Sequence, residues 1–248
     1  MSRRNNIIGS VVNPLYYSPA LWIDFSDASS LSLSGSSITQ ANDKSGNGRH
    51  FSNVVGTNQP QLVSAALNGR SIARFDGVND ELLLSTNGLM KNVTGATIYV
   101  VRRWAASPGS TSIMFKIASA TSATRGSLQG GNVANRNAVG GRTLDADGFV
   151  RVDSTTATDT QWKVQTGVFD IANTDLYLYV QSALEGSTLS YQSATTTSNT
   201  DSAHAAIGSG NFVSRFGGDI AEILVFHEAH NAAKREDVWN YLRSRWSI

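Results

Sequence analysis

The sequence predicts a single all-β domain, a sandwich of antiparallel strands closed by one C-terminal helix. Side chains recur with a period of two in short runs, for example Ile98 and Val100 within residues 96–104 and Leu176, Leu178 and Val180 within residues 175–181. Gly, Asn, Asp and Ser separate these runs, as they do in turns between antiparallel strands. Helical spacing of apolar residues occurs convincingly only near the C-terminus, so we expect many strands and few helices.

Residues 1–19 are predicted to form an extended anchoring arm that precedes the sandwich of residues 20–248. Pro14 and Pro19 favour an extended path over a helix. The arm carries the apolar residues Ile7, Ile8, Val11, Val12, Leu15, Tyr16 and Tyr17. We expect these side chains to pack either along their own domain or on a partner chain.

After the arm, the period-two pattern of side chains predicts a series of strands. Strands are predicted over residues 20–24, 49–54, 72–75, 81–84, 96–104, 111–117, 161–169, 175–181, 203–208 and 219–226. Residues 118–147 are rich in Ser, Ala, Gly and Asn, and are predicted to be long loops within the domain. In the last element Asn231 is the expected N-cap of a helix, because Val238, Leu242 and Trp246 follow at helical spacing.

Composition excludes several classes of function. The 248 residues carry 20 basic and 19 acidic side chains, and this net charge of +1 provides no field for nucleic acid. No cysteine is present, which excludes disulfides, thiolate metal sites and thiol redox chemistry. The apolar residues near the start are interrupted by Gly9, Ser10 and Asn13, so we expect neither a signal peptide nor a membrane span.

Two polar segments are predicted to be tight turns. In DKSGNGRH (residues 43–50), Gly46 and Gly48 permit positive φ, while Asp43 and Asn47 can bond local backbone groups. FDGVND (residues 75–80) has the same character. The alternative interpretation is a calcium site, because Asp43 and Asn47 offer the hard oxygen ligands that calcium requires.

Four segments together carry a resemblance to a known family. They are ALWIDFSDASSL (20–31), DKSGNGRH (43–50), ALNGRSIARFDGVND (66–80) and the C-terminal stretch from GGDIAEILVF to the end (217–248). In this order they resemble LamG-like domains of the concanavalin A-like lectin and glucanase superfamily. The resemblance covers residues 20–248 and implies a concanavalin A-like (LamG-type) jelly-roll β-sandwich, a fold frequent in bacteriophage virion proteins and extracellular adhesion modules.

The resemblance also bears on cofactors and catalysis. In calcium-binding relatives an Asp precedes the late-strand Glu, whereas this chain has Ala221 before Glu222, so one ligand of that site is missing. The glucanases of the superfamily resemble one another in a Glu-x-Asp-x-Glu strand, which this chain lacks. His227 and His230 are three residues apart, not the four of a zincin helix. We therefore predict a protein without enzymatic activity that requires no cofactor.

Two functions fit these expectations. The first is a bacteriophage virion structural or decoration protein, bound to capsid or tail proteins through residues 1–19 and displaying many copies, or a homo-oligomer, on the particle surface. The alternative is a stand-alone carbohydrate-binding adhesion module that binds cell-surface glycans. Its expected stacking aromatics are Trp104, Trp162, Tyr177, Tyr179 and Tyr191. Neither nucleic acid nor membrane is an expected partner.

Overall fold

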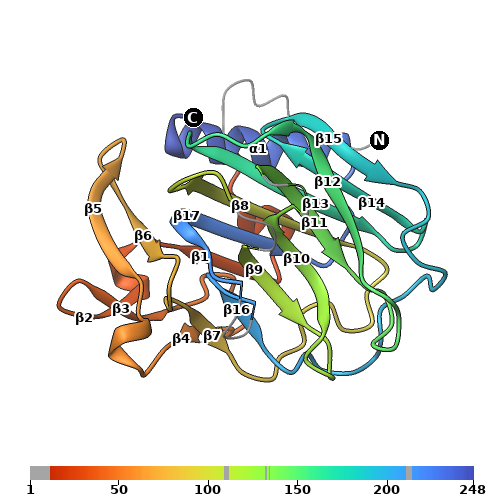
Figure 1. The fold of residues 1–248 in the computed structure, drawn as a ribbon, viewed down its shortest axis with the longest axis horizontal. Coiled ribbons are helices and arrows are strands. Elements are labelled where there is room, and N and C mark those ends of the chain that lie inside the picture. Colours follow the sequence, from red (N-terminus) through yellow and green to blue (C-terminus); the bar gives the residue numbers. More distant parts are fainter. Residues whose placement is uncertain (1–11, 109–111, 132, 134, 211–213) are drawn as a thin grey trace, which may run out of the picture.

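The computed structural model describes residues 12–108, 112–131, 133, 135–210 and 214–248. Antiparallel pairing joins the strands into one continuous sheet that folds over into two layers (Figure 1). The back layer contains β5 (Gln61–Leu67), β6 (Arg70–Asp76), β1 (Leu21–Asp24), β17 (Gly217–Phe226), β8 (Ala96–Trp104), β13 (Lys163–Asp170), β14 (Asp175–Val180) and β15 (Ala183–Thr188).

The front layer contains β4 (Phe51–Ser52), β7 (Leu82–Leu84), β16 (Ala205–Ile207), β9 (Ile113–Ala118), β10 (Thr124–Gly130), β11 (Arg136–Gly141) and β12 (Val150–Ala157). The hairpin of β2 (Leu31–Ser34) and β3 (Ser37–Ala41) connects the layers, because β3 pairs with both β4 and β5. Three 3-10 turns, η1 (Pro14–Tyr17), η2 (Ala28–Ser30) and η3 (Gly56–Asn58), and the helix α1 (Ala232–Trp246) complete the described elements.

The main core fills the space between the layers. Val100 and Ile223 face it from the back layer, where their strands pair in register, and Leu128 and Val139 face it from the front layer. These side chains are fully buried, as expected where two sheets pack face to face. The predicted all-β sandwich with one C-terminal helix is therefore confirmed for the described residues.

Helix α1 covers the outer face of the back layer. Asn231 caps it as predicted, with its side-chain oxygen accepting a hydrogen bond from the Lys234 amide at 3.0 Å. Val238, Trp239 and Leu242 pack on this face in a second buried cluster. Within the described residues, no helix is long and apolar enough to cross a membrane.

A buried carboxylate links α1 to the sheet. Glu222 on β17 is 1% exposed and accepts hydrogen bonds from the indoles of Trp22 and Trp246, each at 2.7 Å, and from the Tyr241 hydroxyl at 2.8 Å. Burial, followed by repulsion from Asp24, raises the pKa of Glu222 to about 7. One acidic side chain therefore joins β1, β17 and α1.

The part of the arm that the structure describes packs on its own domain. The Tyr17 hydroxyl donates to the Asp237 carboxylate on α1, and the Lys234 ammonium lies 5.6 Å from the centre of the Tyr17 ring. Leu15 and Tyr16 are 47% and 76% exposed, and Val12 is partly buried. The arm residues Ile7, Ile8 and Val11 lie outside the described residues, so their expected docking stays a prediction.

One part of the strand prediction is wrong. Each predicted strand overlaps a strand of the structure, but residues 118–147 contain β10 and β11 rather than long loops alone. Small residues occupy these strands because neighbours pack closely against them. A Cβ on Gly126, for example, would lie 2.7 Å from Met90 Sδ. Strands β2, β3, β5, β12 and β15 were not predicted either.

The buried imidazole of His230 makes folding sensitive to acid. It is 2% exposed, its ring centre is 4.4 Å from that of Phe226, and its Nδ1 is 3.0 Å from the Tyr99 hydroxyl. Burial lowers its pKa to about 4 from an ordinary value of 6.5. The neutral form stabilises the fold fully above the unfolded-state pKa, and this contribution is lost as the pH falls through the folded-state value.

We therefore expect His230→Phe, which retains an aromatic ring, to lose less stability on acidification than the wild type. Urea unfolding from about pH 8 down to about pH 4 measures the difference in the free energy of unfolding between the two proteins, and the other titrating groups cancel in this difference. The free energy of unfolding of the wild type minus that of the variant should decrease as the pH is lowered. A difference that stays constant across this range would contradict the assignment.

Candidate ligand-binding groove

A groove of about 800 Å³ opens on the outer face of the front layer. Side chains of β9, β10, β12 and the β11–β12 loop line it: Ile113, Thr124, Gln129, Arg142, Phe149, Arg151 and Asp153, together with Ala123 and Ser214. On β12, Val152 faces the core while Arg151 and Asp153 face outward, as strand alternation requires. The groove therefore lies on the opposite face of the sandwich from α1.

An aromatic ring lies on the sheet within the groove. Phe149 is 41% exposed, and a Cβ on Gly140 of the neighbouring strand would lie 2.5 Å from its Cζ. Only the absence of a side chain at Gly140 lets the ring rest against the backbone there. An exposed phenyl face held in this way is a platform on which an apolar ligand face can stack.

Polar groups with unused hydrogen-bonding capacity surround this ring. Gln129 is 3% exposed; its Oε1 accepts from the Ser127 hydroxyl, while its Nε2 makes no hydrogen bond within the described residues. The Nε of Arg151 pairs with Oδ1 of Asp153 at 3.1 Å. Register places Arg151 directly opposite Gly140, so its side chain starts beside the backbone on which the Phe149 ring rests.

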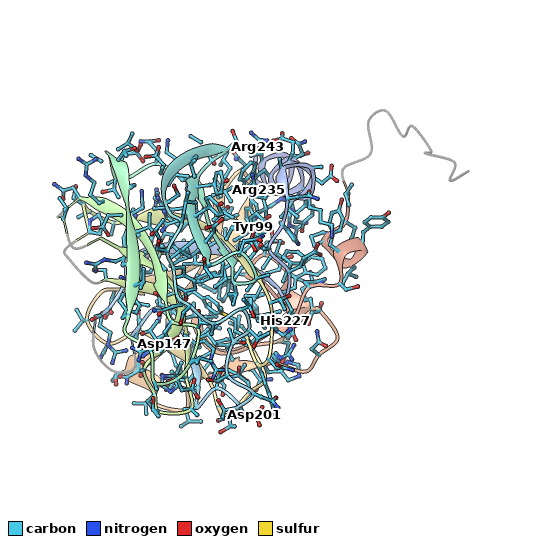
Figure 2. All side chains as sticks on the ribbon, turned by 90° about the vertical axis from the view of Figure 1, so that its right-hand side faces the viewer. Tyr99, Asp147, Asp201, His227, Arg235 and Arg243 are labelled. Carbon is cyan, nitrogen blue, oxygen red and sulfur yellow. The ribbon has the colours of Figure 1, made fainter. Side chains whose placement is uncertain are left out.

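Arg142 is held by backbone carbonyls of β10 and of its own loop. Its Nε donates to the carbonyl of Thr124 at 3.0 Å, and its Nη1 donates to the carbonyl of Asp147 at 2.8 Å. A carbonyl oxygen carries no full charge, so the guanidinium is oriented but its charge is not neutralised. The loop is seen at Asp147, on the left in Figure 2, whereas Arg235 and Arg243 mark α1 toward the right.

A buried arginine on β10 fixes the β11–β12 loop. Arg125 on β10 is fully buried and donates to Asp145 in this loop at 2.6 Å. It also donates to the carbonyls of Met90 and Thr200, so three loops meet on one guanidinium. Burial alone would raise the pKa of Asp145, but hydrogen bonds from Arg125 and Thr200 lower it below the ordinary value.

Two of the aromatics predicted to stack on glycans lie in the core. Trp104 and Tyr191 are each 1% exposed, and the Trp104 indole donates to Asn137 at 3.1 Å. Their ring faces pack against Phe216 and Phe169, respectively. No face is left for a sugar, and the expected stacking role is corrected for these two residues.

The other three predicted aromatics lie away from the groove. Trp162 and Tyr179 are partly buried and pack against the cluster beneath α1, with Arg103 5.5 Å from the Trp162 ring centre and Arg235 4.5 Å from that of Tyr179. Tyr177, also partly buried, donates its hydroxyl to Asp175. The structure therefore brings the five predicted rings to no common site.

The predicted calcium ligands serve the turn itself. The Asp43 carboxylate accepts hydrogen bonds from the amides of Trp22, Ser45 and Arg49 and from the Ser45 hydroxyl, at 2.8 to 3.1 Å. Asn47 donates its side-chain amide to the carbonyls of Pro19 and Ala20. Both Asp43 oxygens thus accept hydrogen bonds within the turn and from β1, which fits the predicted turn role, while the calcium interpretation stays a prediction. Across the described ranges, no three His, Asp or Glu side chains are grouped to hold a metal.

The fold places the chain beside solved domains of the jelly-roll β-sandwich class. No family model and no curated protein matches the sequence. The likeness is therefore one of structure.

Three solved structures illustrate this likeness. The binding domain of Paraclostridial Mosquitocidal Protein 1 superposes with a TM-score of 0.63 at 12% identity, covering 92% of this chain and 53% of that one. Domain 4 of the arabinanase AbnA from Geobacillus stearothermophilus, in complex with arabinotriose, gives 0.58 at 14% identity and 90% and 97% coverage. The binding domain of Botulinum Neurotoxin DC, in complex with SialylT, gives 0.58 at 10% identity, covering 92% and 52%. This chain spans about half the length of the two toxin domains.

Proposed function

We propose that the protein is a carbohydrate-binding module and that the groove around Phe149 is its binding site. The observation that carries the proposal is an exposed aromatic ring seated on Gly140, with unused hydrogen-bond donors of Gln129 and Arg151 beside it. A sugar needs both features, because its C–H face stacks on an aromatic ring while its hydroxyls require donors and acceptors. The arabinotriose complex of the AbnA domain, a fold relative, supports this choice of ligand class.

The groove favours binding over hydrolysis. Glycoside hydrolysis by the common mechanisms needs two carboxyl groups flanking the scissile bond. Among the described lining residues the groove holds one carboxylate, Asp153, which pairs with Arg151. The buried Glu222 lies on the other layer, beneath α1. These features support a module without catalytic activity.

Phe149→Ala tests the proposal. Wild-type protein is screened on a glycan array, and the affinities of its best ligands are measured by calorimetry. We expect Phe149→Ala to weaken binding by about tenfold or more, because the stacking platform is lost, while Phe149→Trp retains it. Leu184→Ala is the matched control, since Leu184 is a 54% exposed apolar residue on β15, outside the groove.

Two outcomes would overturn the proposal: a wild-type protein that retains no glycan, or a Phe149→Ala variant that binds as tightly as the wild type. Circular dichroism of each variant checks that the fold is intact. Display on a bacteriophage particle through residues 1–19 stays a prediction. It is compatible with glycan binding, because many linked copies raise the effective concentration of a weak site.

A further inference from the structure

We infer that the groove selects sugars that carry a carboxylate, and that Arg151 and Arg142 bind this group. The inference rests on the proposed carbohydrate-binding function and names the ligand class of the same groove. The inference follows from the N–H donors of both guanidinium groups that have no acceptor within the described residues.

Arg151 is largely buried, yet most of its hydrogen-bond donors have no acceptor within the described residues. Its side chain is 13% exposed, and its one charged partner is Asp153, reached through Nε. The terminal Nη1 and Nη2 groups make no hydrogen bond within the described residues. Oδ1 of Asp153 is itself buried without a hydrogen-bond partner of good geometry. Both amino groups therefore remain able to donate hydrogen bonds to a ligand in the groove, and a carboxylate is the acceptor that suits a guanidinium best.

Arg142 adds a second positive charge that no carboxylate of the described residues pairs. Its bonds to the carbonyls of Thr124 and Asp147 leave Nη2 free within the described residues. Nearby, burial and then repulsion from Arg142 lower the pKa of Lys116, whose ammonium donates to the carbonyl of Ser122. The two guanidiniums that line the groove face one carboxylate, that of Asp153, so the lining carries a net charge of +1.

The arrangement suits a carboxylate on a sugar ring. Arg151 lies opposite Gly140 in the strand register, and the Phe149 ring rests on Gly140, so a ring stacked on Phe149 reaches Arg151 with its substituents. A planar carboxylate can accept two parallel hydrogen bonds from a guanidinium, which hydroxyls of a neutral sugar do not match in charge or geometry. The free amide of Gln129 remains for a hydroxyl.

Matched ligands test the inference on the wild-type protein. Trigalacturonic acid is compared with its methyl ester, and α2,3-sialyllactose is compared with its methyl ester and with lactose. We expect at least one free acid to bind about tenfold or more tightly than its ester, with the difference shrinking as salt is raised. Equal affinities for acids and esters would overturn the inference and leave the proposed function intact. Binding to none of these ligands or to any array glycan would remove both.

Two substitutions act in opposite directions. Arg151→Gln should weaken binding of the acid about tenfold and change binding of its ester less than about threefold. Asp153→Asn removes the competing carboxylate and should tighten binding of the acid. Arg70→Gln is the control, because it removes one positive charge from an exposed position on β6, outside the groove. Parallel losses for acid and ester, or stronger binding of a sulfated analogue than of the acid, would contradict the carboxylate assignment.

Discussion

Replacing Glu222 with Ala is expected to destabilise the fold by about 4 kcal/mol, a large part of the stability of a typical domain. The change leaves the indoles of Trp22 and Trp246 and the hydroxyl of Tyr241 without their common acceptor. It also opens a cavity between β17 and α1, and unsatisfied buried donors and cavities both lower stability. Urea unfolding followed by tryptophan fluorescence measures the loss.

Glu222→Gln removes the ionisable carboxyl group but nearly preserves the shape of the side chain, so it separates these two contributions to stability. An amide has a single acceptor oxygen and turns its own N–H groups toward the remaining donors, so we expect a loss of about 2 kcal/mol. Because the folded-state pKa of Glu222 is raised to about 7, its contribution is fully present below the ordinary value of 4.5 and is lost as the pH rises through 7. The penalty of Glu222→Gln should therefore shrink with rising pH.

The control for both variants is Glu236→Gln. Glu236 lies on α1 with its side chain 52% exposed and pairs with Arg243, so the expected change is below about 1 kcal/mol. If Glu222→Ala were no more destabilising than this control, the carboxylate would not hold α1 on the sheet.

Arg125→Met is expected to cost about 4 kcal/mol and also to disable the groove. The variant leaves Asp145 without its cation and frees the carbonyls of Met90 and Thr200. Since Asp145 belongs to the loop that carries Arg142 and Phe149, the platform loses its support. Chemical unfolding measures the stability, and calorimetry with the best array ligand, at a temperature where the variant is folded, measures the affinity.

Arg125→Lys and Lys91→Met make this test specific. Lysine keeps the charge but cannot reach all the acceptors of a planar guanidinium, so we expect an intermediate loss. Lys91 pairs with Asp201 at the surface, where both side chains are more than a third exposed, and its replacement should cost less than about 1 kcal/mol. Undiminished affinity in folded Arg125→Met protein would show that the loop is held by other contacts.

The sequence allowed the sandwich to be predicted but not the groove, and the residues involved explain why. Residues 96–104 are rich in β-branched and aromatic side chains, and the pattern around Asn231 is local, so β8 and α1 were predictable. In β10 and β11 the small residues Gly126 and Gly140 suggest loops. The side chains that pack against them lie outside their own strands, so the sequence of each strand does not show why glycine is needed. Glycine occurs at these positions because Met90 and Phe149 pack against the backbone there, and such contacts cannot be predicted from local sequence patterns.

The same limit applies to the aromatic rings expected to stack on sugars. Trp104 and Tyr191 were chosen by residue type, yet pairing across the layers decides which rings are covered. Phe149 follows Gly148 in a stretch without alternation, so it showed no local sign of function. The pair Arg151 and Asp153, two residues apart, is a local sign of a polar outward face in this stretch.

The sandwich has two unlike sides, and this polarity sets how the molecule can meet a surface. Tyr17 contacts Asp237 on α1 beside the back layer, while the groove opens through the other layer. A surface that approached the back layer would therefore meet α1 and Tyr17, whereas one that approached the front layer would meet the groove.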